Sequence, residues 1–182
     1  MAGKFSFRLS HPGQRPSLPA KIIVGQQPGE TDAHVLLKAL AFLLFDRERL
    51  EIGIDLHQDA IPFRPDIVQL DYEMRPQLWI ECGDCSVAKL DKLAVKVPDA
   101  EIWVMRRSLA EAEELARLMR KADLRRHRYQ LLGWDADMFD EVLALLRGRN
   151  EVFWVAGSFE PPLAQFEFNG LWFEGSFSVL QV

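Results

Sequence analysis

The sequence predicts an α/β (α+β) fold, in which helices flank a mixed sheet and β-hairpins lie at both ends of the chain. Three observations support this class. Gln77–Cys82, Ser86–Ala94 and Glu101–Met105 have the patterns of strand, helix and strand, an order that requires a parallel crossover pair. Lys4–Leu9 alternates apolar and polar residues, as a half-buried strand does. Asn169-Gly170, between two short apolar runs, is the strongest hairpin signal in the chain.

Length and composition indicate an ordinary globular protein. The chain has 182 residues, so we expect residues 1–182 to form a single domain with a substantial core. Apolar residues make up 48% and charged residues 27% of the chain, which is typical of globular domains. The formal net charge is −5, so any nucleic-acid binding must use a local basic patch.

The sequence also indicates the cellular compartment in which we expect the protein. No apolar run is long enough to cross a membrane, and the first residues lack the apolar core of a signal peptide. The chain contains 2 cysteines, too few for a disulfide-rich secreted scaffold. We therefore expect a cytoplasmic, reducing environment and no membrane partner.

The first third of the chain predicts a hairpin, a helix and a strand. A loop rich in Pro and Gly, His11–Pro19, separates the first strand from a second one at Lys21–Val24. Pro28–Asp32 opens a helix and places acids in its first turn, where they suit the helix dipole. From Val35 to Phe45 this helix is apolar nearly all round, which predicts that it is buried. Glu51–Leu56 has the pattern of another strand.

One stripe of this buried helix is polar. Glu30, His34 and Lys38 recur every four residues, so they share one helical face.

The central stretch carries two acids and two lysines. Asp66 stands at the head of a short apolar strand, and Glu81 lies in the aromatic-rich strand that follows. Because the two strands are neighbours, we expect their carboxylates to converge at one end of the sheet. Lys89 and Lys92 are three residues apart on the next helix and share a face, so both can point toward the same place.

The C-terminal half continues the alternation and then becomes rich in strands. Its first three elements are a helix at Leu109–Ala122, a strand at Arg125–Leu132 and an amphipathic helix at Ala136–Leu146. Short strands then follow at Val152–Val155, Leu163–Phe168, Leu171–Glu174 and Phe177–Val182. We expect this tail to pair with the N-terminal hairpin and to close a sheet or a small barrel.

Several of these motifs resemble those of the YaeQ family, in an order that covers nearly the whole chain. The matching segments are Pro28–Asp32, Leu40–Phe42, Pro65-Asp66, Leu78–Gly83 and the hairpin that contains Trp172. The resemblance implies the PD-(D/E)xK, restriction-endonuclease-like fold to which that family is assigned. Such a fold contains a helix, a three-stranded antiparallel meander, a crossover helix and a fourth strand. The order of elements expected above agrees with it.

The resemblance implies a metal-dependent nuclease acting on nucleic acid, either DNA or RNA. Phosphodiester hydrolysis of this type uses Mg²⁺ or Mn²⁺ held by oxygen ligands, and the ion lowers the pKa of the attacking water. On this interpretation Asp66, Glu81 and Glu30 hold the metal. The lysine of the pattern normally stands two residues after the strand glutamate, where this chain has Gly83.

Basic residues on the two helices match the YaeQ pattern and offer replacements for the missing lysine. Lys89 and Lys92 match positions on the crossover helix, so one of them can balance the developing negative charge. His34 and Lys38 match basic positions of the first helix and would line the same cleft.

Each candidate residue also has a purely structural interpretation. Asp66 can act as a turn former, and Glu30 can serve the N-terminus of the helix. Glu81 interrupts an apolar strand, and a buried acid needs a partner, which Lys89 or Lys38 could supply as an ion pair. A catalytically inactive binding or interaction module on the same fold is therefore the alternative function.

Cys82-Gly83-Asp84-Cys85 suggests a third function, that of a thiol redox protein. A Cys-x-x-Cys motif between a strand and a helix N-terminus is the arrangement in which the helix lowers a thiol pKa. The pair is also half of a tetrahedral zinc site, and no second pair follows at suitable spacing. Cysteines without a chemical role are the remaining interpretation.

The run Arg117–Arg128 contains six Lys or Arg residues and is the candidate nucleic-acid surface. It can follow a phosphate backbone, with Tyr129 or Trp134 as a stacking face. Alternatively, it is a solvated helix end that pairs with nearby acids, namely Glu111, Glu113 and Glu114.

Overall fold

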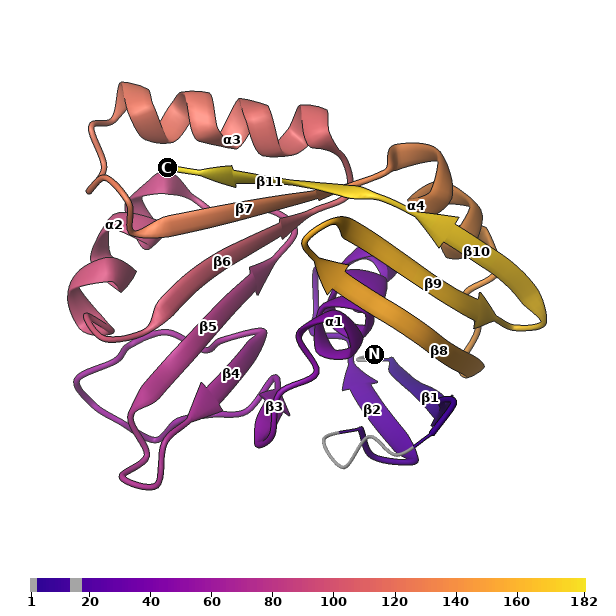
Figure 1. The fold of residues 1–182 in the computed structure, drawn as a ribbon. Helices are drawn as coiled ribbons and strands as arrows, with labels where there is room; N and C mark the ends of the chain where they lie inside the picture. Colours follow the sequence, from indigo (N-terminus) through magenta and orange to yellow (C-terminus); the bar gives the residue numbers. More distant parts are fainter. Residues whose placement is uncertain (1–2, 14–17) are drawn as a thin grey trace.

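The computed structural model describes residues 3–13 and 18–182, and it confirms an α/β fold with a mixed sheet and flanking helices (Figure 1). The strands form two separate sheets, and neither closes into a barrel. The loop expected at His11–Pro19 falls partly outside the described residues.

A six-stranded sheet forms the part of the molecule expected to hold the site. Its strands, in spatial order, are β11 (Phe177–Gln181), β7 (Tyr129–Trp134), β6 (Glu101–Arg106), β5 (Pro76–Cys82), β4 (Ile67–Leu70) and β3 (Leu50–Ile52). Strands β3, β4 and β5 are antiparallel, whereas β5, β6 and β7 are parallel. This arrangement confirms the crossover pair around the helix α2 (Val87–Lys96).

A five-stranded sheet joins the two ends of the chain. Its strands, in spatial order, are β10 (Leu171–Gly175), β9 (Pro162–Phe168), β8 (Arg149–Phe159), β1 (Lys4–Ser10) and β2 (Lys21–Gly25). The hairpins β1–β2 and β9–β10 are confirmed, and β1 joins β8 in a parallel pair. The expected pairing of tail and N-terminal hairpin therefore occurs.

The last strand of the tail departs from the expectation. β11 leaves the five-stranded sheet and pairs antiparallel with β7 of the other sheet. Phe177 is buried there, with its ring 5.3 Å from that of Trp134. The pairing covers the edge of β7, and a covered edge cannot pair with another chain.

The helix α1 (Asp32–Phe45) lies between the two sheets and is the centre of the main core (Figure 1). All of its residues except Asp32 and His34 are buried, which confirms the expectation from its apolar sequence. Thr31 caps its N-terminus by accepting a hydrogen bond from the backbone N–H of His34.

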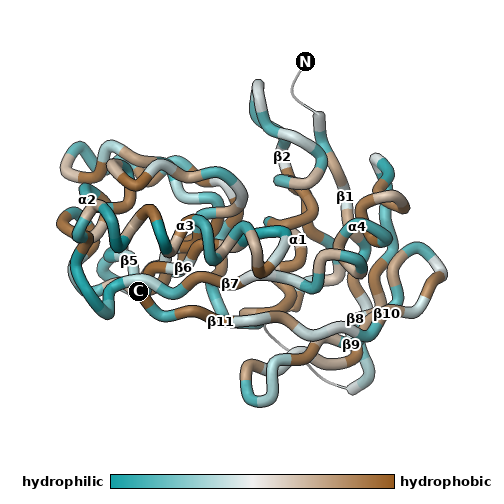
Figure 2. Tube along the Cα trace, turned by 90° about the horizontal axis from the view of Figure 1, so that it is seen from above, coloured by the Kyte–Doolittle hydropathy of each residue, from teal (hydrophilic) through white to brown (hydrophobic). Residues whose placement is uncertain are grey.

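Two helices cover the outer face of the six-stranded sheet. α2 and α3 (Leu109–Lys121) enclose a second core there, and Figure 2 shows both alternating between hydrophobic and hydrophilic residues. Ser86 and Ser108 cap their N-termini. α4 (Ala136–Ala144) contacts α1 and β10. Among the described residues, no helix is both long enough and apolar enough to cross a membrane.

Two predicted boundaries differ because the backbone turns left-handed. The strand expected at Glu51–Leu56 ends at Ile52, where Gly53 has φ +60°. The strand expected from Arg125 begins at Tyr129, because His127 has φ +59° and the segment before it forms a turn.

Gly133 in β7 should be intolerant of any side chain. A Cβ atom there would lie 2.5 Å from the carbonyl oxygen of Ser108 and 2.7 Å from backbone atoms of Leu109. Because this neighbour is backbone at the start of α3, Gly133→Ala should lower the free energy of unfolding by about 1–3 kcal/mol. Gly148→Ala is the control, since nothing lies within 4 Å of its Cβ position. Equal urea denaturation curves for the two variants would contradict this packing.

Candidate functional site

The polar stripe of α1 meets Asp66 in a single charged cluster. The ammonium of Lys38 lies 2.9 Å from both carboxylate oxygens of Glu30 and 3.4 Å from Oδ1 of Asp66. Nε2 of His34 lies 3.1 Å from the same Oδ1 and 3.8 Å from Oε1 of Glu30. The stripe and the head of β4 therefore form one site, which we call the α1 cluster: Glu30, His34, Lys38 and Asp66.

Local structure fixes both carboxylates of the α1 cluster. Glu30 lies in the turn before α1, where its Oε2 accepts a hydrogen bond of 3.0 Å from the backbone N–H of Gln27. Asp66 precedes β4, and its Oδ2 accepts a hydrogen bond of 2.7 Å from the backbone N–H of Cys82 at the end of β5. Asp66 is thus attached to two neighbouring strands.

Three residues of the α1 cluster can hold a metal ion. One ligand atom from each of Glu30, His34 and Asp66 lies within 4.8 Å of the other two. Nε2 of His34 is buried between two carboxylates, 3.1 Å from Oδ1 of Asp66 and 3.8 Å from Oε1 of Glu30. An imidazole nitrogen that faces two carboxylate oxygens can share a cation with them.

Asp66 stays ionised in this setting. Burial alone would raise its pKa, but His34, Lys38 and the Cys82 amide outweigh burial, so the pKa lies below the ordinary value for an aspartate. The α1 cluster therefore presents a charged carboxylate over the whole physiological range.

The side chain of Glu81 points toward the core under α2 and α3. Along β5, Ile80 and Cys82 belong to the core around α1, whereas Trp79 belongs to the core under α2 and α3. Glu81 shares the Trp79 side, because residues two apart on a strand face the same way. Its Oε1 accepts a hydrogen bond of 2.7 Å from the indole N–H of Trp79.

Glu81 forms a direct ion pair with a lysine of α2. Nζ of Lys89 lies 2.7 Å from Oε2 of Glu81, as the structural interpretation of this acid expects. Burial raises the pKa of Glu81 despite this partner, and the charge of Asp66 raises it further. The two predicted acids are therefore electrostatically coupled, with pKa values displaced in opposite directions.

The lysine candidates differ in their burial and in their ion-pair partners. Lys89 is half-buried against Glu81, whereas Lys92 is exposed and forms no ion pair with any residue that the structure describes. Lys38, matched only through the resemblance, is the most deeply buried of the three, with 3% of its surface exposed.

Gly83 cannot easily be replaced by a lysine. It follows β5 with φ +79°, a backbone conformation that costs free energy for any residue with a Cβ atom. The glycine at the position where the resemblance expects a lysine thus has a conformational cause.

An open groove runs beside the α1 cluster. It has a volume of about 550 Å³ and is lined by Glu30 and His34 of the cluster, but not by Asp66, Lys38 or Glu81. Its other walls come from three segments. Pro28 and Gly29 lie in the turn before α1, Gly83 and Asp84 follow β5, and Arg107 and Glu111 lie at the start of α3.

The thiols are not activated. Cys82 is buried, and burial raises the pKa of its thiol well above the ordinary value. Burial also raises the pKa of Cys85 to about 12, with the charge of Glu81 adding to the effect. A redox cysteine needs a lowered pKa, so these directions do not favour the thiol redox alternative.

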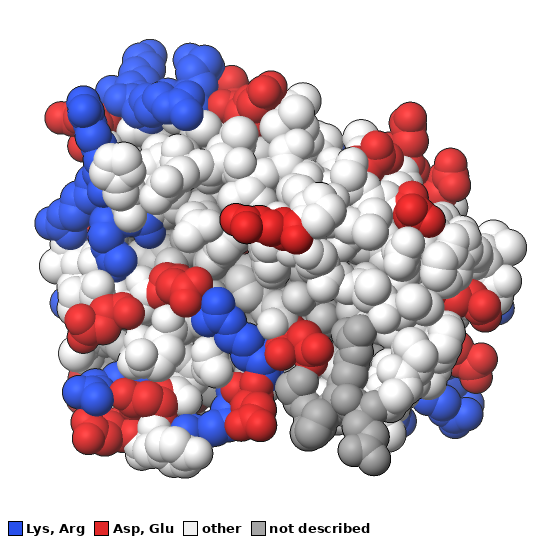
Figure 3. Space-filling model, viewed as in Figure 1, with Lys and Arg blue, Asp and Glu red and all other residues white. Residues whose placement is uncertain are grey.

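The basic run gathers at one end of α3. Figure 3 shows Lys and Arg side chains concentrated over the end of this helix and the loop that follows. Two of the six basic side chains in this run contact other described residues. Arg117 forms an ion pair of 2.7 Å with Glu114, and Arg128 donates hydrogen bonds to backbone carbonyls just after α2. The prediction that Tyr129 or Trp134 offers a stacking face is wrong, because both side chains are fully buried in the sheet.

Sequence reasoning missed one site residue. His34 was assigned to the cleft but not to the metal ligands, although its spacing of four from Glu30 places the two on one face. That spacing is the sequence feature that could have identified His34 as a ligand. The contact of Asp66 with His34 joins two distant segments and cannot be predicted from the sequence.

Replacing Glu81 by glutamine should test whether its ion pair with Lys89 is structural. The pKa of Glu81 is raised in the folded protein above the ordinary value for a glutamate, so ionisation costs more there than in the unfolded chain. This cost is absent below pH 4.5 and grows as the pH rises through the folded pKa. Glu81→Gln should therefore match wild type near pH 4 and be at least as stable at pH 7, by thermal unfolding.

Glu113→Gln on the exposed face of α3 is the control for the charge change. A melting temperature of Glu81→Gln several degrees below both proteins at pH 7 would identify the Glu81–Lys89 pair as a structural one.

Comparison with known proteins places the chain in a family. Residues 3–150 match the family described as YaeQ protein. Two solved structures are similar: the YaeQ protein of Xanthomonas axonopodis pv. citri, with TM-score 0.70, 20% identity and coverage of 100% of this chain and 99% of that one; and the YaeQ protein of Pseudomonas syringae, with TM-score 0.72, 16% identity and coverage of 100% and 96%. No curated protein matches. Because the family match spans most of its length, this chain belongs to the YaeQ family.

Proposed function

We propose that this protein is a divalent-metal-dependent phosphodiesterase of the PD-(D/E)xK type that cleaves nucleic acid. The observation that carries the proposal is the convergence of Glu30, His34 and Asp66 beside an open groove. The order of α1, the antiparallel meander β3–β4–β5, α2 and β6 agrees with the fold expected from the resemblance and supports the assignment.

The residues of the α1 cluster fit a divalent cation. Two carboxylates and one imidazole suit Mg²⁺ or Mn²⁺, and the imidazole favours Mn²⁺. The ion would neutralise Glu30 and Asp66 in place of the ammonium of Lys38, which must then move away from them. When bound, the metal would polarise the phosphate and lower the pKa of a bound water.

The chain's own residues would supply the remaining chemistry. Lys89 is held beside Glu81 with 29% of its side chain exposed, and its ammonium would contact an oxygen of a phosphate bound at the α1 cluster. Glu81, with its raised pKa, would position this ammonium. Lys92, exposed one turn along α2, would contact a phosphate further along the strand.

A non-catalytic binding module is the second candidate, and one specific observation favours it. Each candidate carboxylate already has a lysine partner: Lys38 for Glu30 and Asp66, and Lys89 for Glu81. An ion pair of this kind stabilises charges without any metal. The two candidates therefore differ in whether a divalent ion displaces Lys38.

Metal titration separates the two candidates. Calorimetric titration of Mn²⁺ and Mg²⁺ into the wild type should show one site, and Asp66→Asn or His34→Ala should weaken Mn²⁺ binding by about 10–100-fold. The control is His57→Asn, because His57 is an exposed histidine outside the cluster, and asparagine tolerates its φ of +51°. Binding that is absent in the wild type, or unchanged in His34→Ala, would reject the metal site.

Cleavage assays test the catalytic step. Labelled single-stranded DNA, duplex DNA and RNA should be cleaved in Mn²⁺, and Lys89→Met should lower the rate by about 10²-fold or more, because it removes a charge that acts in the transition state. Lys96→Met, at the exposed end of the same helix, is the control. Metal binding without cleavage of any of the three substrates would move the conclusion to the binding module.

A further inference from the structure

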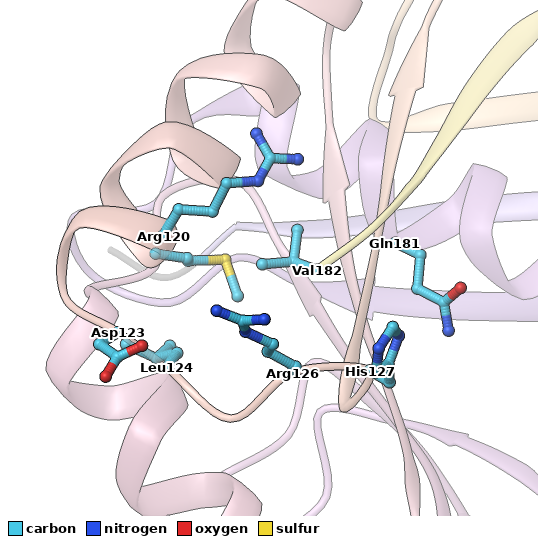
Figure 4. Close-up of a pocket in the computed structure, with 8 residues that line it drawn as sticks. Arg120, Asp123, Leu124, Arg126, His127, Gln181 and Val182 are labelled. Carbon is cyan, nitrogen blue, oxygen red and sulfur yellow. The ribbon is translucent and has the colours of Figure 1, made fainter.

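A second hollow lies at the end of α3, away from the α1 cluster. It has a volume of about 380 Å³, and Figure 4 shows side chains entering it from the helix, from the following loop and from β11. Its lining residues are Met119, Arg120, Asp123, Leu124, Arg126, His127, Gln181 and Val182. None of them belongs to the α1 cluster.

The floor of this hollow is apolar. Met119 and Leu124 are buried, and the side chain of Val182 completes the surface. Arg128 holds the loop from outside by donating to the carbonyls of Val97 at 3.0 Å and Ala100 at 3.2 Å. An apolar ring can therefore lie on a preformed surface, which is how most ligand pockets bury their ligands.

The rim is cationic. Arg120 projects from the last turn of α3 on one side of Val182, and the guanidinium of Arg126 rises from the loop on the other side (Figure 4). Neither guanidinium forms an ion pair or hydrogen bond with a residue in the described part of the chain, in contrast to Arg117 and Arg128. Two free guanidinium groups at one hollow match the planar, multidentate recognition of a phosphate.

Two further polar groups select among anionic ligands. The carboxylate of Asp123 and the amide of Gln181 lie at opposite sides of the hollow. The edge of a nucleobase offers amine donors to a carboxylate and both donors and acceptors to an amide, whereas a hydrocarbon offers neither. Asp123 and His127 have φ +53° and +59°, so the loop holds two uncommon backbone conformations where it meets the hollow.

We infer that this hollow binds a phosphorylated nucleoside, with the phosphate at Arg120 and Arg126 and the base on the apolar floor. The same chemistry is offered by a free mononucleotide and by a terminal nucleotide of a nucleic-acid strand. The site is independent of the proposed hydrolysis, because no residue of the α1 cluster lines it.

The test is calorimetry in EDTA, so that no divalent ion takes part. The four ribonucleoside monophosphates, adenosine alone and inorganic phosphate alone are titrated separately into the wild-type protein. At least one monophosphate should bind about tenfold or more tightly than adenosine or phosphate, because both halves of the hollow are then used.

Arg126→Gln should weaken that binding by about tenfold, the effect of losing one hydrogen-bonded charge. Arg125→Gln is the matched control: it removes the same charge from the adjacent, exposed position, which does not line the hollow. Asp66→Asn should bind as the wild type does, even if the phosphodiesterase proposal fails.

A 5′-phosphorylated oligonucleotide distinguishes the two sources of ligand. Tighter binding of the oligonucleotide than of the mononucleotide assigns the hollow to strand ends, and the reverse assigns it to free nucleotides. Equal loss in Arg125→Gln and Arg126→Gln would show only a diffuse basic surface and overturn the inference. Monophosphates that bind no better than inorganic phosphate would overturn it as well.

Discussion

The buried ammonium of Lys38 is the constraint on which the rest of the site depends. Only 3% of this residue is exposed, because α1 lies between two sheets. A buried charge without a partner costs several kcal/mol, so Glu30 and Asp66 must lie where they do, at 2.9 Å and 3.4 Å. These contacts link the start of the helix to the head of β4. The ammonium that a metal ion would displace in the proposed function thus also fixes the fold locally.

The six-stranded sheet divides the chemistry between its two faces. β5 sends Glu81 toward Lys89 on α2, while the next residue, Cys82, uses its backbone N–H to hold Asp66 near α1. The carboxylates therefore differ in environment although they are neighbours, and their pKa values move in opposite directions. Pairs of acids with pKa values displaced in this way are typical of sites where one group stays ionised and the other is protonated more readily.

Two features explain how this chain departs from the nuclease pattern. The left-handed backbone at Gly83 leaves no unstrained place for a lysine directly after β5, so Lys89 on α2 supplies a cation to the same acid. The basic surface at the end of α3 is separate from that acid, and part of it serves structure, since Arg128 binds the carbonyls at the end of α2. Two arginines of this surface that form no ion pair with a described residue, Arg120 and Arg126, line a hollow.

The sequence alone determined the helices, most strands, the buried character of α1 and the spacing that places Glu30, His34 and Lys38 on one face, because these follow from local periodicity. It also identified the family. Tertiary structure decided the rest. The split into two sheets, the transfer of β11 to β7 and the burial of Tyr129 and Trp134 depend on contacts between distant residues. The contacts of Asp66 with His34 and Lys38, and those of Glu81 with Trp79 and Lys89, likewise join elements far apart in the sequence, and no local pattern encodes them.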